Sequence, residues 1–384
     1  MKSVSFMEKL PKLVKTRDTP FLLLNLEKIK RNYYDLKNAI KNVEIYYAVK
    51  SNSSMSIITQ LKNLGCKFDV ASMGEIDNLV NLGVDPENMS FGNTIKKEKD
   101  IKTAFDLGIN LFVADCEAEV EKIARNAPGS DLFIRIATQG IDSDWPLTGK
   151  FGTDIDSAKE LGLYAAKKGL NPIGVSFHVG SQCYNPYNWK TAIMEAAEFF
   201  EYLEENGLHP YYINLGGGFP TPYLKPIPSM EEIGEVINDS IESYFGGREL
   251  KIVAEPGRYM VGDAGLLVSK VILTSNRLGK DWIYVDTGVF HGLTEVLGGI
   301  MYPVAFYDAT NLKKIEDENE KIVTLAGPTC DSFDIIYEDY SVPASVKIGD
   351  YMVFYSAGAY TSGYNTYFNS IKGPGMVVIN DFKG

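Results

Sequence analysis

Residues 45–49 read IYYAV, a short apolar run of aromatic and β-branched side chains that Lys50 follows directly. Runs of this kind are typical of strands buried on both faces of a parallel sheet. Seven further runs occur along the chain, namely KFDVA (67–71), MSFGN (89–93), LFVAD (111–115), LFIRIA (132–137), GVSFHV (174–179), YYINLG (211–216) and KIVAEP (251–256). The sequence therefore predicts eight parallel strands.

Stretches with helical spacing separate these runs. Residues 157–169 and 191–207 are the longest, and each stops at a glycine, which commonly ends a helix. Seven helices fit between the strands, and the amphipathic segment 25–41 supplies an eighth before the first strand. This alternation favours an α/β fold, a closed (β/α)8 barrel, over an open sheet.

The pattern changes after about residue 262. Strand-like runs such as LLVSKVILTS and DYMVFYSAG are joined by turns, without a long helical pattern between them. This part is predicted to be a mainly β domain, and its closure into a β-barrel remains open. We expect a barrel over residues 20–262, close to the usual length of roughly 250 residues, and a β domain from residues 1–19 and 263–384.

Composition excludes several classes of protein. The formal net charge is −12 at pH 7, whereas a nucleic-acid-binding domain normally has a basic face. The first residues hold no apolar run long enough for a signal peptide or a membrane span, which favours a cytoplasmic protein. The cysteines are scattered, with no CxxC pair or His–Cys cluster, so neither a metal site nor a disulfide framework is expected.

Charged or glycine residues stand at or near the ends of the predicted strands, where the active site of a (β/α)8 barrel lies. Each of them alone would also suit a structural role, such as a solvated charge or a buried histidine. Together they predict a functional rim. They are Lys50, Asp69, Asn93, Arg135, His178, Gly216, Gly217, Gly218, Glu255, Gly257 and Arg258.

The segments NLGGGFP (214–220) and EPGR (255–258) favour phosphate binding, because glycine backbone N–H groups and an arginine can converge on phosphate oxygens. P-loop spacing is absent, and no GxGxxG opens a helix. Pyridoxal 5'-phosphate fits these features. Its aldehyde needs an amine such as Lys50, and its pyridine nitrogen needs a carboxylate such as Glu255.

Eight motifs occur in order along nearly the whole chain, namely YAVKSN around Lys50, KFDVAS (67–72), WPLTGKFG (145–152), HVGSQ (178–182), GGGFP (216–220), EPGR (255–258), GPTCDSFD (327–334) and GAYT (358–361). The set resembles the fold-type III pyridoxal-phosphate decarboxylases, which act on ornithine, lysine, arginine or diaminopimelate. The resemblance is greatest to the bacterial ornithine and ornithine/lysine decarboxylases. It implies a carboxy-lyase that converts L-ornithine or L-lysine to putrescine or cadaverine, in polyamine biosynthesis.

The resemblance also implies roles for single residues. Lys50 would bind the cofactor covalently, Glu255 would keep its ring nitrogen protonated, and His178 would stack on the ring. The polar groups near the lysine and ring would be Asp69, Glu75 and Arg135, and the phosphate would be held by Ser181, Gly217, Gly218, Gly257, Arg258 and Tyr360.

A two-fold homodimer with shared active sites is a further implication. Cys330 of the partner subunit would protonate the α-carbon after carbon dioxide leaves, and Asp331 of the partner subunit would bind the distal ammonium of the substrate. Tyr360 would also contact the substrate. In the segment 286–303, Glu295 would replace an aspartate that eukaryotic ornithine decarboxylases carry, and His291 would either shape the pocket or be a solvated loop histidine.

Two alternatives remain open. Diaminopimelate or arginine decarboxylase activity is compatible with the barrel motifs, although diaminopimelate decarboxylases usually carry Cys-Glu-Ser where this chain has residues 330–332. A catalytically silent relative that binds a regulatory partner belongs to a different class. Such relatives typically lose the cofactor lysine or its supporting residues, whereas this chain keeps Lys50, His178, Glu255, Arg258, Cys330 and Asp331.

Overall fold

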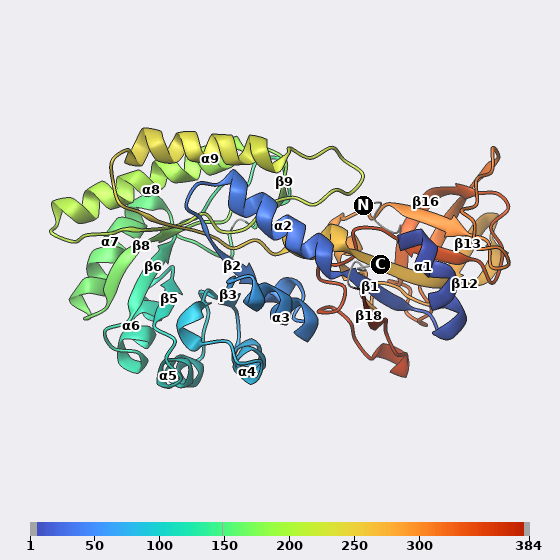
Figure 1. Cartoon of the computed structure of the whole chain (residues 1–384), viewed down its shortest axis with the longest axis horizontal. Helices are drawn as coiled ribbons and strands as arrows, with labels where there is room; N and C mark the ends of the chain where they lie inside the picture. Colours follow the sequence, from blue (N-terminus) through green and yellow to red (C-terminus); the bar gives the residue numbers. More distant parts are fainter. Residues whose placement is uncertain (1–5, 148, 380–384) are drawn as a thin grey trace. The chain divides into compact units, whose positions relative to one another are not determined.

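The computed structural model describes residues 6–147 and 149–379, and its chain divides into two compact units. The barrel unit contains Lys30–Pro220 and Ile227–Met260. The β unit contains the described parts of Met1–Ile29, Thr221–Pro226 and Val261–Gly384. Figure 1 labels several elements of each unit and colours the chain from its N-terminus to its C-terminus.

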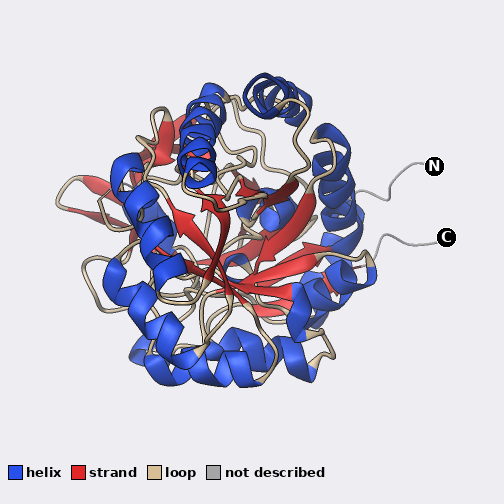
Figure 2. Ribbon diagram, turned by 90° about the vertical axis from the view of Figure 1, so that its left-hand side faces the viewer, coloured by secondary structure: helices blue, strands red, loops and turns tan. Residues whose placement is uncertain are grey.

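Within the described residues of the barrel unit, eight parallel strands close into a ring in the order β10–β11–β2–β3–β4–β5–β6–β8. Helices surround these strands (Figure 2), which confirms the predicted (β/α)8 fold. The strands are β2 (Glu44–Ala48), β3 (Lys67–Val70), β4 (Met89–Phe91), β5 (Leu111–Ala114), β6 (Asp131–Arg135), β8 (Asn171–Ser176), β10 (Tyr212–Asn214) and β11 (Lys251–Ala254).

The outer layer of the barrel follows the predicted helical segments. Capping residues fix several helix starts. Ser229 and Glu232 form a reciprocal capping box at the start of α9, and the Asp154 side chain accepts the N–H of Ser157 at the start of α7. The helices are α2 (Leu26–Ala39), α3 (Met55–Asn63), α4 (Met73–Asn81), α5 (Glu98–Asp106), α6 (Glu117–Asn126), α7 (Ile155–Lys167), α8 (Tyr187–Glu205) and α9 (Met230–Phe245).

Large side chains fill part of the barrel interior. They form a buried cluster of Tyr46, Val113, Phe133, Ile173, Tyr212 and Val253. Because these residues pack the interior, a ligand has to bind at the strand ends, as is usual for this fold. The ring order makes β10, β11, β2 and β3 successive neighbours, so the residues at their carboxyl ends meet on one side of the rim.

The described strands of the β unit form one eight-stranded sheet. The sequence did not decide whether this domain would close into a β-barrel. The main path of the sheet runs β14–β17–β12–β13–β15–β16. The elements are α1 (Phe6–Thr16), β1 (Phe21–Asn25), β12 (Gly265–Arg277), β13 (Lys280–Val285), β14 (Val304–Tyr307), β15 (Glu320–Ala326), β16 (Ile335–Pro343), β17 (Tyr351–Phe354) and β18 (Gly375–Ile379).

The strand β1 lies in a different unit from the one that the predicted domain boundary at residue 20 implies. β1 pairs antiparallel with β12, with Phe21 opposite Val268, and parallel with β18, with Phe21 opposite Gly375. Residues 20–29, which were expected in the barrel domain, therefore belong to the β unit. An apolar run such as FLLLN fits any buried strand, and its partners lie far away in sequence, so local pattern could not assign it.

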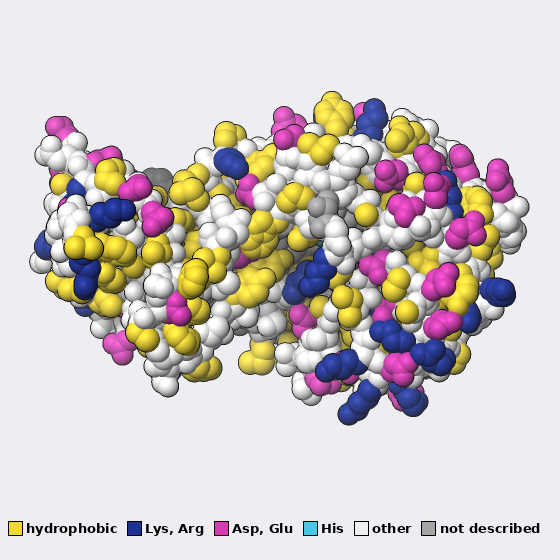
Figure 3. Space-filling view, turned by 180° about the vertical axis from the view of Figure 1, so that it is seen from behind, with side chains coloured by type: hydrophobic (Ala, Val, Ile, Leu, Met, Phe, Trp, Pro, Cys, Tyr) yellow, Lys and Arg dark blue, Asp and Glu magenta, His cyan; other side chains and the backbone are white. Residues whose placement is uncertain are grey.

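None of the helices described is both long and apolar enough to cross a bilayer. On the face seen in Figure 3, basic side chains are interspersed with acidic ones over the barrel unit and do not gather into one basic surface.

Candidate active site

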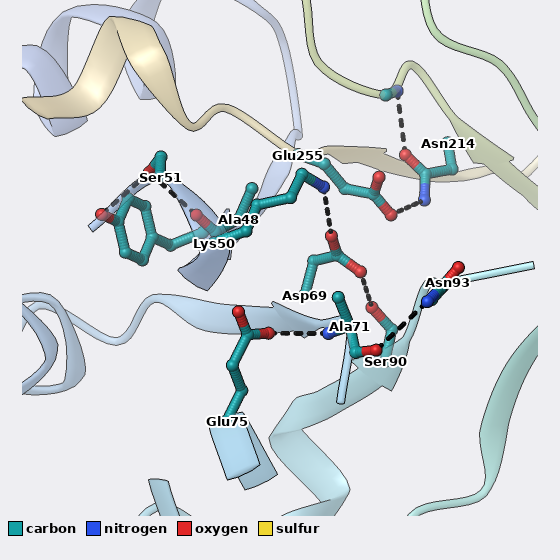
Figure 4. A network of polar contacts seen from close by, with 12 residues as sticks. Ala48, Lys50, Ser51, Asp69, Ala71, Glu75, Ser90, Asn93, Asn214 and Glu255 are labelled. Atoms are coloured by element: carbon teal, nitrogen blue, oxygen red, sulfur yellow. Dashed lines mark hydrogen bonds and ion pairs between the residues drawn. The ribbon is translucent and has the colours of Figure 1, made fainter. Parts of the chain in front are cut away.

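Lys50 lies directly after β2, in a single turn of 3-10 helix, η1 (Val49–Ser51). Ser51 Oγ donates to Ala48 O at 2.9 Å and ties this turn to the strand end. The Lys50 side chain is 48% exposed, and its Nζ lies 3.4 Å from Oδ2 of the buried Asp69 on β3 (Figure 4). The turn thus presents a primary amine at the rim, beside a buried acid.

Two carboxylates, the buried Asp69 and the partly buried Glu255, have raised pKa values. Burial raises the pKa of Asp69, against the opposing charges of Lys50 and Arg135. Burial, and then the charge of Asp69, raises the pKa of Glu255 to about 7, again opposed by Lys50. A carboxyl group poised near neutrality is driven to ionise by a nearby positive charge. Glu255 is therefore well suited to hold a protonated ring nitrogen.

Asn214 ends β10 and is fully buried beside Glu255. Its Nδ2 donates to Oε1 of Glu255 at 2.5 Å, and its Oδ1 accepts the N–H of Gly216 at 2.9 Å (Figure 4). Asn214 is not among the site residues predicted from the sequence. The available signal was a polar residue inside the run YYINLG, because a strand buried on both faces normally carries apolar residues.

His178 follows β8, and its Nδ1 accepts the backbone N–H of Gly180 at 3.1 Å. Burial, together with the charges of Arg135 and Lys50, lowers the pKa of His178 well below its ordinary value. The imidazole is therefore neutral at pH 7 with its proton on Nε2, as the bond to Nδ1 requires. It offers a flat, uncharged face on which an aromatic cofactor can stack.

The glycine loop Gly216–Gly218 leaves no room for side chains. An added Cβ would lie 1.8 Å from Phe177 O at Gly216, and 3.0 Å from His178 Nε2 at Gly217. Gly216 and Gly218 also adopt positive φ angles of +63° and +104°. Only glycine therefore fits at these positions, and the bare backbone suits close approach to phosphate oxygens.

Arg258 is 4% exposed at the start of α10 (Arg258–Val261). Its Nη2 donates to Ser181 Oγ at 3.3 Å, and its guanidinium lies 6.0 Å from the ring centroid of Trp145. At Gly257, an added Cβ would lie 3.0 Å from Ser51 Cβ, so this position is also closely packed. A buried guanidinium beside a serine hydroxyl is suited to bind a phosphate.

The other predicted rim residues brace the strand ends. Glu75 accepts the N–H of Ala71 at 2.7 Å, and Asn93 donates to Ala71 O at 3.3 Å, so both bind the backbone that follows β3. Arg135 ends β6, where burial lowers its pKa and its guanidinium lies 5.1 Å from the Phe151 ring. The barrel unit thus brings all its predicted site residues to one rim.

The residues at this rim fit pyridoxal phosphate. Lys50 provides an accessible amine for the aldehyde, and Glu255 provides a partly buried carboxyl for the pyridine nitrogen. The glycine loop and Arg258 provide a backbone cradle and a cation for the phosphate.

The family model for the pyridoxal binding domain of the pyridoxal-dependent decarboxylases matches residues 26–262. The chain belongs to this family. It is 35% identical to the lysine/ornithine decarboxylase of Selenomonas ruminantium, over 99% of this chain and 95% of that protein. It is also 33% identical to antizyme inhibitor 2 of Xenopus laevis, over 92% of this chain and 79% of that protein.

A solved structure extends the likeness to three dimensions. The lysine/ornithine decarboxylase of Vibrio vulnificus complexed with putrescine superposes with a TM-score of 0.89 at 29% identity, and the match covers 100% of both chains. Family membership and this likeness make the protein a pyridoxal-phosphate-dependent decarboxylase.

Cys330, Asp331 and Tyr360 are predicted site residues of this decarboxylase that lie in the β unit. Cys330 and Asp331 precede β16, and the Cys330 N–H donates to Asn369 Oδ1 at 3.1 Å. Tyr360 has a positive φ of 63°, and its ring stacks on that of Tyr364 at a centroid distance of 5.9 Å. The roles of these residues remain predictions.

Glu295 and His291 are buried within the β unit, with 1% and 0% exposure. The alternative of a solvated loop histidine is therefore wrong for His291. The cause is a β-bridge that places His291 opposite Asn365 and packs the two segments together. The substrate-binding role of Glu295 stays a prediction.

Proposed function

We propose that this decarboxylase converts L-ornithine or L-lysine to putrescine or cadaverine, as a cytoplasmic homodimer in polyamine biosynthesis. The proposal rests on the Lys50 amine, held 3.4 Å from Asp69 at the barrel rim together with the partly buried acid Glu255. Similarity to a lysine/ornithine decarboxylase over 99% of the chain supports the substrate class.

When bound, the cofactor supplies an electron sink for the electron pair left on the α-carbon as carbon dioxide departs. Lys50 would hold the cofactor through its aldehyde group and would release it when the substrate amine takes the same place. Glu255 holds the proton on the ring nitrogen. The positive charge of the protonated ring stabilises the ionised form of the Glu255 carboxyl group, and this carboxylate in turn stabilises the protonated ring. His178 covers the ring, and the phosphate is held by Ser181, Gly217, Gly218, Gly257, Arg258 and Tyr360.

The substrate end of the site is proposed to come from a second copy of the chain. Cys330 of the partner subunit returns a proton to the α-carbon, and Asp331 of the partner subunit binds the distal ammonium. A desolvated carboxylate needs a cationic partner, and a diamino acid supplies one. Tyr360 and Glu295 are the remaining proposed contacts to the substrate.

Asp331→Ala tests the substrate class. Truncating one member of a desolvated charge pair costs about 2–5 kcal/mol, so turnover of ornithine and lysine should fall at least about tenfold while the cofactor stays bound. The purified enzyme is assayed against ornithine, lysine, arginine, diaminobutyrate and meso-diaminopimelate, with Glu231→Gln on the exposed face of α9 as control. Preference for meso-diaminopimelate, or full activity in Asp331→Ala, would refute the proposed recognition.

A regulatory binding protein is the second candidate, favoured by the 33% identity to an antizyme inhibitor. The two functions differ in one simple observation. A protein that uses Lys50 as proposed is yellow with its cofactor, and its absorption band changes when ornithine or lysine is added. A colourless protein that leaves both amino acids unchanged would favour the binding function.

A further inference from the structure

Asn214 is an unusual residue for its position in the barrel. Its neighbours Tyr212, Ile213 and Leu215 are all fully buried apolar or aromatic residues, and Asn214 is itself fully buried. A buried primary amide destabilises a protein unless its donors and acceptor are hydrogen-bonded. The two hydrogen bonds of Asn214 therefore need an explanation in terms of what they hold.

The chemistry of the two partners fixes the orientation of the amide. An ionised carboxylate only accepts hydrogen bonds, so the Glu255 oxygen must face the Asn214 NH2 group at 2.5 Å. A backbone N–H only donates, so Gly216 must face Oδ1 at 2.9 Å. One side chain thus holds an acid with one end and the start of the glycine loop with the other.

We propose that Asn214 is a positioning residue that fixes Glu255 relative to the glycine loop Gly216–Gly218. Glu255 can then bind the ring of a cofactor while the loop binds the phosphate of the same cofactor. The inference rests on the proposed function, which gives Glu255 and the loop their roles. The backbone reinforces this coupling, because the Glu255 N–H donates to Gly216 O at 2.7 Å.

An amide is the side chain that this position requires. The charged groups that act on Glu255 are Asp69 from β3, Lys50 from η1 and Arg135 from β6. An aspartate at position 214 would add a third carboxylate and, when ionised, could not donate to Glu255. It would still accept the Gly216 N–H. Alanine would lose both hydrogen bonds.

The two substitutions therefore test separately the hydrogen bond to Glu255 and the hydrogen bond to Gly216. Cofactor-free Asn214→Asp should bind pyridoxal phosphate about ten- to a hundred-fold more weakly than wild type near pH 8, the effect of losing a hydrogen bond to a charged group. Its affinity should recover as the pH falls towards about 6, because a shared proton restores a donor between the two acids. Inorganic phosphate should compete with pyridoxal phosphate for Asn214→Asp about as strongly as it does for wild type.

Asn214→Ala should lose affinity for pyridoxal phosphate and for inorganic phosphate alike, with no recovery at lower pH. The matched control is Asn238 on α9, which also uses both ends of its amide. It donates to Ala39 O at 2.8 Å and accepts the Lys41 N–H at 2.9 Å. Asn238→Asp and Asn238→Ala should bind cofactor like wild type. Binding is followed by cofactor fluorescence, and folding of each variant by circular dichroism.

Two results would overturn the positioning role. One is wild-type cofactor affinity in both Asn214 variants, and the other is an equal loss in the Asn214 and Asn238 variants. A different failure would strike the proposed function instead. If borohydride reduction of the wild-type holoenzyme labels a lysine other than Lys50, the site assignment fails whatever Asn214 does.

Discussion

At the scale of single residues, Lys50 has a testable chemical role. Its half-exposed amine stands beside the buried Asp69 at the end of the first barrel strand. Borohydride reduction of the holoenzyme should therefore place the pyridoxyl group on Lys50, as read by peptide mapping. Lys50→Ala should lose most turnover and still bind the cofactor weakly, because the phosphate contacts remain.

The raised pKa of Glu255 predicts how the cofactor-free protein responds to pH. Burial raises this pKa from an ordinary value of 4.5 to about 7, so the folded state keeps a proton that the unfolded state loses between these values. The resulting stabilisation is complete below the unfolded pKa and is lost as the pH rises through about 7.

Glu255→Gln removes this titration. The difference in free energy of unfolding between wild type and Glu255→Gln should therefore fall on going from about pH 5 to about pH 8, by on the order of 3 kcal/mol. Urea unfolding of the cofactor-free proteins measures it. The control variant is Glu231→Gln, at an exposed position of α9. A difference in free energy of unfolding between wild type and Glu255→Gln that stays constant over this pH range would contradict the prediction.

At the scale of elements, the loop that carries Cys330 is built around the buried Asp334. This carboxylate accepts the Val289 N–H at 2.8 Å, the Thr329 N–H at 3.0 Å and the Thr329 Oγ1 at 2.7 Å. An added Cβ at Gly288 or Gly327 would collide with it. Asp334 therefore ties the Cys330 loop to the segment that follows β13.

Asp334→Ala should leave two backbone N–H groups and a hydroxyl without their acceptor. Each buried unsatisfied group costs about 1–3 kcal/mol, so the variant should lose several kcal/mol of stability by urea unfolding. Alkylation of the Cys330 thiol should also become faster, because its loop is released. Asp331→Ala serves as control, since the Asp331 side chain accepts the Phe333 N–H of its own loop at 2.8 Å and does not tie the loop to another segment of the described chain. Unchanged stability in Asp334→Ala would show that the loop is held by other contacts.

The sequence predicts an element well when the interactions that form it are between residues close together in the chain, and poorly when they are between distant segments. The barrel strands are fixed by local apolar runs, and Lys50, His178 and Glu255 could be placed at the rim because they directly follow or end such runs. The bridge made by Asn214 could not be foreseen, since it depends on the neighbouring ends of β10 and β11. The same holds for the burial of His291, which a distant segment creates.

At the scale of the whole molecule, the proposed homodimer predicts complementation. If Lys50 and Cys330 act in one site from different subunits, then Lys50→Ala and Cys330→Ala are each inactive but restore activity when mixed. Random exchange makes half of the dimers mixed, each with one intact site, so about a quarter of wild-type sites should return. The activity of the mixture is compared with that of each variant alone. No recovery, with exchange proven by native mass spectrometry, would argue for sites built within one subunit.

The pairing of β1 has a consequence for synthesis of the chain on the ribosome. The strand Phe21–Asn25 leaves the ribosome early, yet both of its partners, β12 and β18, belong to the last third of the chain. Until translation reaches Gly375–Ile379, an apolar strand waits with an open edge, which is a site for aggregation. Products that terminate before β18 should therefore accumulate in inclusion bodies or bound to chaperones, even when their barrel is complete.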